Sequence, residues 1–163
     1  MANNAAMRRL LAWLALSGLI VVLDQASKAW IAALFQVNES IAVAPFFDLV
    51  RVYNLGAAFS FLASASGWQR WFFVVLALAV SAWLAYLIRQ HAREQLLPAA
   101  LALVLGGAIG NVIDRLLQGA VLDFLHFHYL GHYFPAFNVA DSAISVGVAL
   151  MLWHSLREAR RPK

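Results

Sequence analysis

The sequence predicts an all-α integral membrane protein that crosses the bilayer with four helices and carries a small β-sheet outside it. Of the 163 residues, 63% are hydrophobic and only 12% are charged. The mean hydropathy of +0.74 lies outside the range of soluble globular domains. The apolar residues form four runs that are long enough to span a membrane. We expect residues 1–163 to form a single membrane-embedded domain.

Charge and cysteine content narrow the possible functions. The formal net charge is +4, but the basic residues are scattered around the hydrophobic runs, which is typical of topology signals. No nucleic-acid partner is therefore expected. The sequence contains no cysteine, which excludes disulfides, thiol nucleophiles and cysteine-based metal sites.

The first span is expected over residues 10–30. A cleavable signal peptide is the alternative, but the nearest small-x-small site, residues 42–44, lies about twenty residues beyond the apolar run, too far for cleavage. The run is therefore expected to remain as a transmembrane helix. Asp24 and Lys28 are four residues apart and can pair, either as an ordinary ion pair at the helix end or as support for a site.

Residues 31–67 are less hydrophobic and in part alternate with period two, which predicts a small sheet or hairpin at the bilayer surface. Asn54 then begins a turn, and taken alone it fits a turn better than a site. The second span is expected over residues 68–88 as scaffold. A short polar connection leads to the third span, residues 97–117, so these two helices should be antiparallel neighbours.

In the third span, Gly106 and Gly110 have the small-xxx-small spacing that allows close approach of another helix. Polar and small residues gather on one side near its end: Gly107, Asn111, Asp114 and Arg115. Asp114 fits a structural ion pair with Arg115 or Lys28 as well as it fits catalysis. Arg115 suits an anionic lipid or a peptide carbonyl.

Residues 118–137 are expected to form an aromatic loop outside the membrane, with Asp123 in it. The loop also holds three histidines, but no His-Glu-x-x-His pattern occurs and no metal site is expected. The fourth span, residues 138–156, carries four polar residues on one face: Asn138, Asp141, Ser142 and Ser145. That face should point into the helix bundle.

The distribution of basic residues predicts the orientation. Eight lie on the side of the termini: Arg8, Arg9, Arg89, Arg93, Arg157, Arg160, Arg161 and Lys163. Four lie on the other side: Lys28, Arg51, Arg70 and Arg115. The positive-inside rule therefore predicts cytoplasmic termini. The candidate polar residues then gather at the outer face: Asp24, Asn54, Asn111, Asp114, Arg115, Asp123, Asn138 and Asp141.

Two carboxylates in a partly dry site cannot both ionise easily, so one keeps its proton and the pair supplies an acid and a base. Such a pair can activate water against a peptide carbonyl. The spacing leaves the pair open among four residues: Asp24, Asp114, Asp123 and Asp141. The spacing also leaves the function open. A proton-coupled transporter would likewise place aspartates inside a helix bundle. A non-catalytic subunit of a membrane assembly is a third possibility. A transporter would favour internal repeats and charges near the midplane.

Five motifs occur in order along the chain: residues 24–28 (DQASK), 54–59 (NLGAAF), 110–115 (GNVIDR), 121–124 (VLDF) and 137–142 (FNVADS). Together they resemble the motif set of the lipoprotein signal peptidases, the signal peptidase II family. The resemblance implies a bacterial inner-membrane aspartyl protease that removes the signal peptide from prolipoproteins, just before a diacylglyceryl-modified cysteine. It implies no cofactor and no metal, contact with membrane lipids, and a monomer.

The same resemblance assigns roles to single residues. The catalytic pair would be Asp123 and Asp141. The residues around the substrate, or around the inhibitor globomycin, would be Asn54, Asn111, Arg115 and Asn138. The residues that support the site would be Asp24, Lys28, Gly107 and Asp114. Residues 31–67 would form a small extracytoplasmic sheet and a surface helix that close over the substrate.

Overall fold

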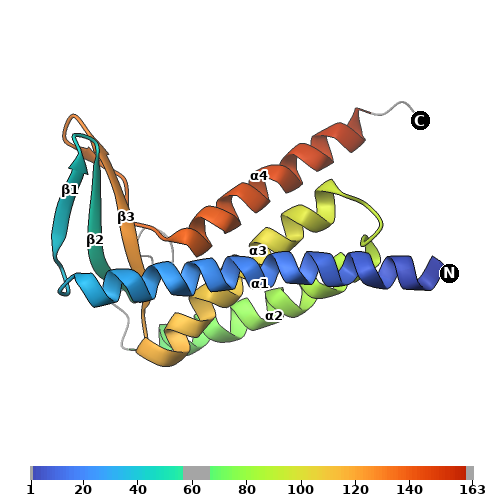
Figure 1. Ribbon diagram of the computed structural model, residues 1–163, viewed down its shortest axis with the longest axis horizontal. Coiled ribbons are helices and arrows are strands. Elements are labelled where there is room, and N and C mark those ends of the chain that lie inside the picture. Colours follow the sequence, from blue (N-terminus) through green and yellow to red (C-terminus); the bar gives the residue numbers. More distant parts are fainter. Residues whose placement is uncertain (1, 57–66, 161–163) are drawn as a thin grey trace.

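The computed structural model describes residues 2–56 and 67–160, and in these residues it has four long helices and a small sheet (Figure 1). The helices are α1 (Ala2–Leu34), α2 (Trp68–Gln90), α3 (Leu96–Gln118) and α4 (Val139–Ala159). All four are long and apolar enough to cross a membrane. The prediction of four helices of membrane-spanning length is therefore confirmed. Helix α1 extends beyond its predicted range at both ends, and the other three agree with theirs to within three residues.

Helix α3 is the centre of the bundle, because the other three helices all pack against it. In its most apolar stretch 56% of the residues are buried, against 6% in α1. A Cβ atom at Gly106 would lie 2.7 Å from the carbonyl oxygen of Ser17, and one at Gly110 would lie 2.6 Å from Oδ2 of Asp24. The two glycines therefore allow α1 to approach α3 closely, as their spacing predicts.

The sheet is antiparallel, and its strands follow one another in chain order. They are β1 (Ser40–Ala44), β2 (Phe47–Asn54), β3 (Val121–Tyr129) and β4 (His132–Tyr133). The hairpin of β1 and β2 confirms the prediction from alternation. The prediction of a loop over residues 118–137 is wrong for β3. The first four residues of this strand are all buried, so they lack the alternating pattern by which a half-buried strand is recognised. The surface helix expected within residues 31–67 is not seen in residues 31–56, and residues 57–66 lie outside the described part of the chain.

The sheet lies at one end of the bundle, and α1 begins and α4 ends at the opposite end (Figure 1). Arg51 in β2 ties the sheet to α1, because its guanidinium donates to the carbonyl oxygens of Ala32 and Phe35 at the end of that helix. Gly119, with a φ of +80°, ends α3. Strand β3 therefore starts directly beside the end of α3, and its first residues meet the beginning of α4.

Candidate active site

The sequence-predicted site residues meet at the junction between the sheet and the helix bundle. Strands β2 and β3 supply Asn54 and Asp123, and the start of α4 supplies Asn138 and Asp141. The remaining polar residues come from α1 and α3: Asp24, Lys28, Asn111, Asp114 and Arg115. Hydrogen bonds connect these residues into one network.

Asp123 is buried, with 3% of its surface exposed. Its Oδ1 accepts a hydrogen bond from Nδ2 of Asn138 at 2.7 Å, and its Oδ2 accepts one from Nδ2 of Asn54 at 3.3 Å. The Oδ1 of Asn54 in turn accepts the backbone N–H of Gly56, so Asn54 stabilises a turn and also contacts the site. The turn that the sequence favours for Asn54 is therefore present, and the same side chain also contacts Asp123.

Asp141 lies in the first turn of α4 and forms a capping box with Asn138. The side chain of Asn138 accepts the backbone N–H of Asp141, and Oδ2 of Asp141 accepts the backbone N–H of Asn138. The other carboxylate oxygen, Oδ1, accepts a hydrogen bond of 2.8 Å from Nδ2 of Asn111. The cap and the position at a helix N-terminus fix this carboxylate and stabilise its negative charge.

The two aspartates interact electrostatically. Burial raises the pKa of Asp123 from its ordinary value of 3.8 to about 7, and the negative charge of Asp141 acts in the same direction. The hydrogen bonds from Asn54 and Asn138 favour the ionised form and oppose this rise. A carboxyl with a pKa near neutrality can both hold and release a proton under physiological conditions.

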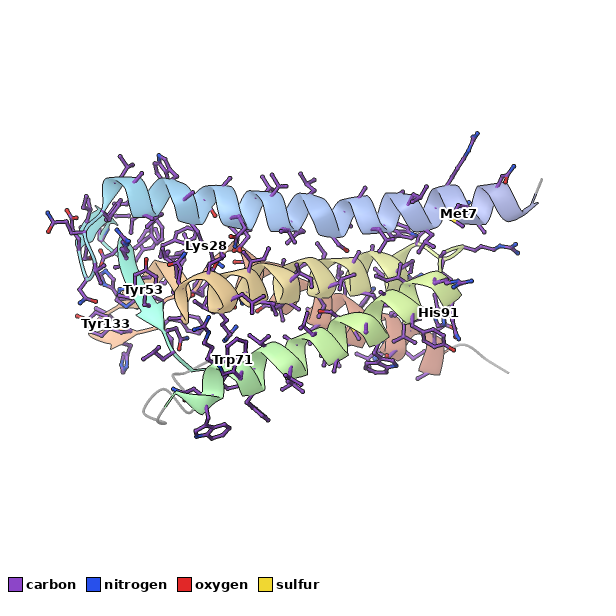
Figure 2. The ribbon with its side chains drawn as sticks, turned by 90° about the horizontal axis from the view of Figure 1, so that it is seen from below. Met7, Lys28, Tyr53, Trp71, His91 and Tyr133 are labelled. Atoms are coloured by element: carbon purple, nitrogen blue, oxygen red, sulfur yellow. The ribbon has the colours of Figure 1, made fainter. Side chains whose placement is uncertain are left out.

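Beneath the pair, Lys28 joins two further carboxylates. Its Nζ lies 2.7 Å from Oδ2 of Asp24 and 2.9 Å from Oδ2 of Asp114, and Figure 2 shows Lys28 between α1 and α3. The pairing of Asp24 with Lys28 confirms the prediction from their spacing. Gln25, which sequence reasoning missed, donates from Nε2 to the side chains of Asp24 and Asp114. Gln25 lies three residues before Lys28 and therefore on the same face of the helix, and this spacing could have identified it.

Arg115 lies at the edge of the same network. Its Nη2 donates to the carbonyl oxygen of Gly56 at 2.9 Å, and its Nη1 to that of Asn111 at 3.3 Å. The guanidinium also lies over the ring of Phe73, 5.3 Å from its centroid. Of the two partners expected for Asp114, the structure shows Lys28 and not Arg115. Arg115 instead lines the pocket.

A pocket of about 980 Å³ opens beside the two aspartates. Its polar end is lined by Asn54, Asn111, Arg115, Asp123 and Asp141. Its apolar part runs along three helices, with Phe73, Leu76 and Val80 from α2, Val104 and Ala108 from α3, and Ile144 and Val146 from α4. The pocket therefore offers two carboxylates to a polar group and an apolar wall to the chain attached to it.

The histidines of β3 are not part of this pocket. His126 and His128 lie beside Asp48, with nitrogen–oxygen distances of 3.7 Å and 3.3 Å. Among the residues that the structure describes, no group of three or more histidine, aspartate or glutamate side chains is arranged to hold a metal ion.

Fold and site together define a multi-pass membrane protein with a pair of aspartates facing a pocket at one end of its helix bundle. Residues 16–157 match the family model described as signal peptidase (SPase) II. The chain belongs to this family.

Relatives and solved structures agree with the assignment. A lipoprotein signal peptidase of Azoarcus sp. (strain BH72) is 58% identical over 151 residues, which cover 93% of this chain and 86% of the relative. One of Janthinobacterium sp. (strain Marseille) is 53% identical over 148 residues, covering 91% and 90%. A bacterial membrane enzyme solved by the in meso method at 2.3 Å superposes with a TM-score of 0.84 at 31% identity, covering 93% of this chain and 92% of the other.

Proposed function

We propose that this chain is an aspartic endopeptidase that cleaves lipid-modified prolipoproteins just before the diacylglyceryl-cysteine, with Asp123 and Asp141 as its catalytic residues. The observation that carries the proposal is the pair itself. A buried carboxylate, Asp123, and a partly buried one, Asp141, come from different elements and face one pocket, and the negative charge of Asp141 raises the pKa of Asp123. Membership of the signal peptidase II family supplies the substrate class.

In the resting pair we assign the shared proton to Asp123. Burial and the charge of Asp141 bring the pKa of Asp123 to about 7, whereas Asp141 is less buried and lies at a helix N-terminus, which favours its ionised form. Asp141 then takes a proton from a water molecule, and the water oxygen bonds to the carbonyl carbon of the scissile peptide. Asp123 gives its proton to the carbonyl oxygen. When the carbon–nitrogen bond breaks, Asp141 returns its proton to the departing amine, and Asp123 takes back the proton from the hydroxyl that becomes the carbonyl of the new acid, which restores the resting pair.

The other polar residues hold the substrate and the pair. Asn54, Asn111 and Asn138 each donate to one of the two carboxylates. Arg115 stays protonated, and its fixed donors suit a peptide carbonyl rather than proton transfer. The apolar part of the pocket accepts the hydrophobic chain on the substrate. Gly107 supports the arrangement because a Cβ atom there would collide with the carbonyl oxygen of Ala140 in α4.

We place the protein in the bacterial cytoplasmic membrane, with cytoplasmic termini and the sheet on the periplasmic side. The eight basic residues near the termini, against four on the other side, support this orientation. The acyl chains of a lipoprotein precursor anchor its scissile bond at the membrane surface. Site and substrate then lie at the same depth. The transporter alternative is not favoured, because the polar residues gather at one end of the bundle and the family is that of signal peptidase II.

Purified protein incubated in detergent with a diacylglyceryl-modified precursor tests the proposal. Mass spectrometry should find a product that begins at the lipidated cysteine, and globomycin should prevent its formation. A precursor without the lipid is the matched control and should be cleaved far more slowly. A folded protein that leaves the lipid-modified precursor intact would refute the proposed activity.

A further inference from the structure

We propose that Lys28 is a positioning residue that fixes the side-chain amide of Asn111 with its N–H toward Asp141. The inference rests on the proposed catalytic role of the aspartate pair. Lys28 is only 3% exposed and does not line the pocket, so it cannot act on a substrate directly. Its hydrogen-bonded route to the pair runs through Asn111, and its positive charge also lowers the pKa of Asp123.

The argument begins with the chemistry of the ammonium group, which carries three N–H donors and no acceptor. Lys28 Nζ has three oxygen partners in the network. They are Oδ2 of Asp24 at 2.7 Å, Oδ2 of Asp114 at 2.9 Å and Oδ1 of Asn111 at 3.1 Å. All three donors are used, so no proton of Lys28 is left to turn elsewhere.

A group that only donates can face only the oxygen end of an asparagine amide. The NH₂ end of Asn111 must then point the other way, where it lies 2.8 Å from Oδ1 of Asp141. A half-turn of this amide would place NH₂ against the ammonium of Lys28 and a carbonyl oxygen against the carboxylate of Asp141. Both contacts would be repulsive. Lys28, together with Nδ2 of Asn138, which donates to the same oxygen of Asn111 at 3.3 Å, therefore determines which atom Asp141 meets.

Asn138 is fixed in a similar way, but by the backbone. Its Oδ1 accepts the N–H of Asp141. Its Nδ2 donates to Oδ1 of Asp123 at 2.7 Å and lies near two further acceptors, the carbonyl oxygen of Leu122 at 3.2 Å and Oδ1 of Asn111 at 3.3 Å. Each aspartate of the pair thus receives an amide donor that cannot reverse. Only the donor to Asp141 depends on a charged side chain.

The carboxylates around Lys28 have donors of their own. Asp24 accepts the backbone N–H of Ala140 at 2.9 Å, and Asp114 accepts that of Leu122 at 3.0 Å. Replacing Lys28 by methionine together with Asp114→Asn turns one cation and two anions into a single anion, so the net charge of the group is unchanged. The double variant therefore removes the donor to Asn111 without adding charge near the pair.

The test compares Lys28→Met/Asp114→Asn with the wild-type protein, which has the same net charge in this group, and with Asp114→Asn, which keeps Lys28. All three are assayed with the lipid-modified precursor below their melting temperatures. We expect kcat of the double variant to be about 100-fold lower than that of either reference protein, because a misplaced catalytic group has losses of this size. KM should stay within about threefold, since the pocket wall is unchanged. A folded double variant with the same kcat as Asp114→Asn would overturn the inference.

If the double variant does not fold, the wild-type protein decides. The side-chain amide signals of Asn111, observed by NMR after selective ¹⁵N labelling, should shift as the aspartate pair titrates and should exchange slowly with solvent. Signals that do not respond to this titration would contradict the orientation. Failure of the proposed function is distinguishable from failure of this inference, because only the former abolishes cleavage by the wild-type protein.

Discussion

Replacing Asp123 by asparagine should remove the loss of stability that this carboxyl causes between about pH 4 and pH 8. In the folded protein the buried carboxyl has a pKa of about 7, and in the unfolded chain it titrates near its ordinary value of 3.8. Between these values the folded state keeps a proton that the unfolded state has released. The contribution of Asp123 to the free energy of unfolding therefore falls as the pH rises through this window.

The magnitude follows from the difference between the two pKa values. Each pKa unit corresponds to about 1.4 kcal/mol. The rise from 3.8 to about 7 in the folded protein therefore lowers the free energy of unfolding by on the order of 4 kcal/mol above pH 7. At about 2–4 °C per kcal/mol for a chain of this length, the melting temperatures should differ by on the order of 10 °C across the window.

Melting temperatures of the wild-type protein and of Asp123→Asn, measured in one detergent from about pH 4 to pH 8, test this value. The melting temperature of Asp123→Asn minus that of the wild-type protein should increase by on the order of 10 °C as the pH rises from about 4 to about 8. Glu39→Gln, which removes a carboxylate outside the pocket, is the control and should keep the wild-type dependence. Parallel curves for the wild-type protein and Asp123→Asn would refute the argument from burial.

Three further predictions concern other parts of the molecule. Arg115→Lys should lower kcat/KM by about 10- to 100-fold without unfolding the protein, because one ammonium cannot replace the fork that donates to Gly56 and to α3. Gly107→Ala should lower the free energy of unfolding by about 1–3 kcal/mol, because its Cβ would collide with α4. A periplasm-dependent phosphatase fused after Lys163 should be inactive, because the basic residues predict a cytoplasmic terminus.

The outcomes that would contradict these predictions are specific. Turnover of Arg115→Lys at the wild-type rate would mean that any cation suffices at this position. For the glycine, the matched control is Gly18→Ala in α1, where an added Cβ meets no atom within 4 Å. Equal melting temperatures of Gly107→Ala and Gly18→Ala would show that α4 does not approach α3 closely enough at Gly107 to exclude a Cβ atom. An active phosphatase would reverse the orientation.

Much of the fold and part of the site could be predicted from local sequence patterns. The four spans follow from apolar runs, and the ion pair of Asp24 and Lys28 follows from helical spacing, which fixes neighbours along one face. The close approach at Gly106 and Gly110 follows from the small-xxx-small rule. In each case the signal lies within a single element, so no knowledge of tertiary contacts is needed.

The remaining features depend on contacts between distant segments. Strand β3 has no alternation over its first four residues, because the helix bundle and the sheet bury both of its faces there. The spacing of four aspartates could not identify the pair. Tertiary packing separates them, because Asp24 and Asp114 are paired with Lys28, whereas Asp123 and Asp141 line the pocket. Gln25 carries no charge and was missed for that reason.

The central claim is that Asp123 and Asp141 act as one unit, and a double-mutant comparison of kcat tests it most directly. Asp123→Asn, Asp141→Asn and the double variant are each confirmed as folded by their melting temperatures and assayed with the lipid-modified precursor. The account predicts that each single variant falls close to background and that the double variant is hardly slower than either. Substantial cleavage by either folded single variant would contradict the account, as would defects that multiply in the double variant.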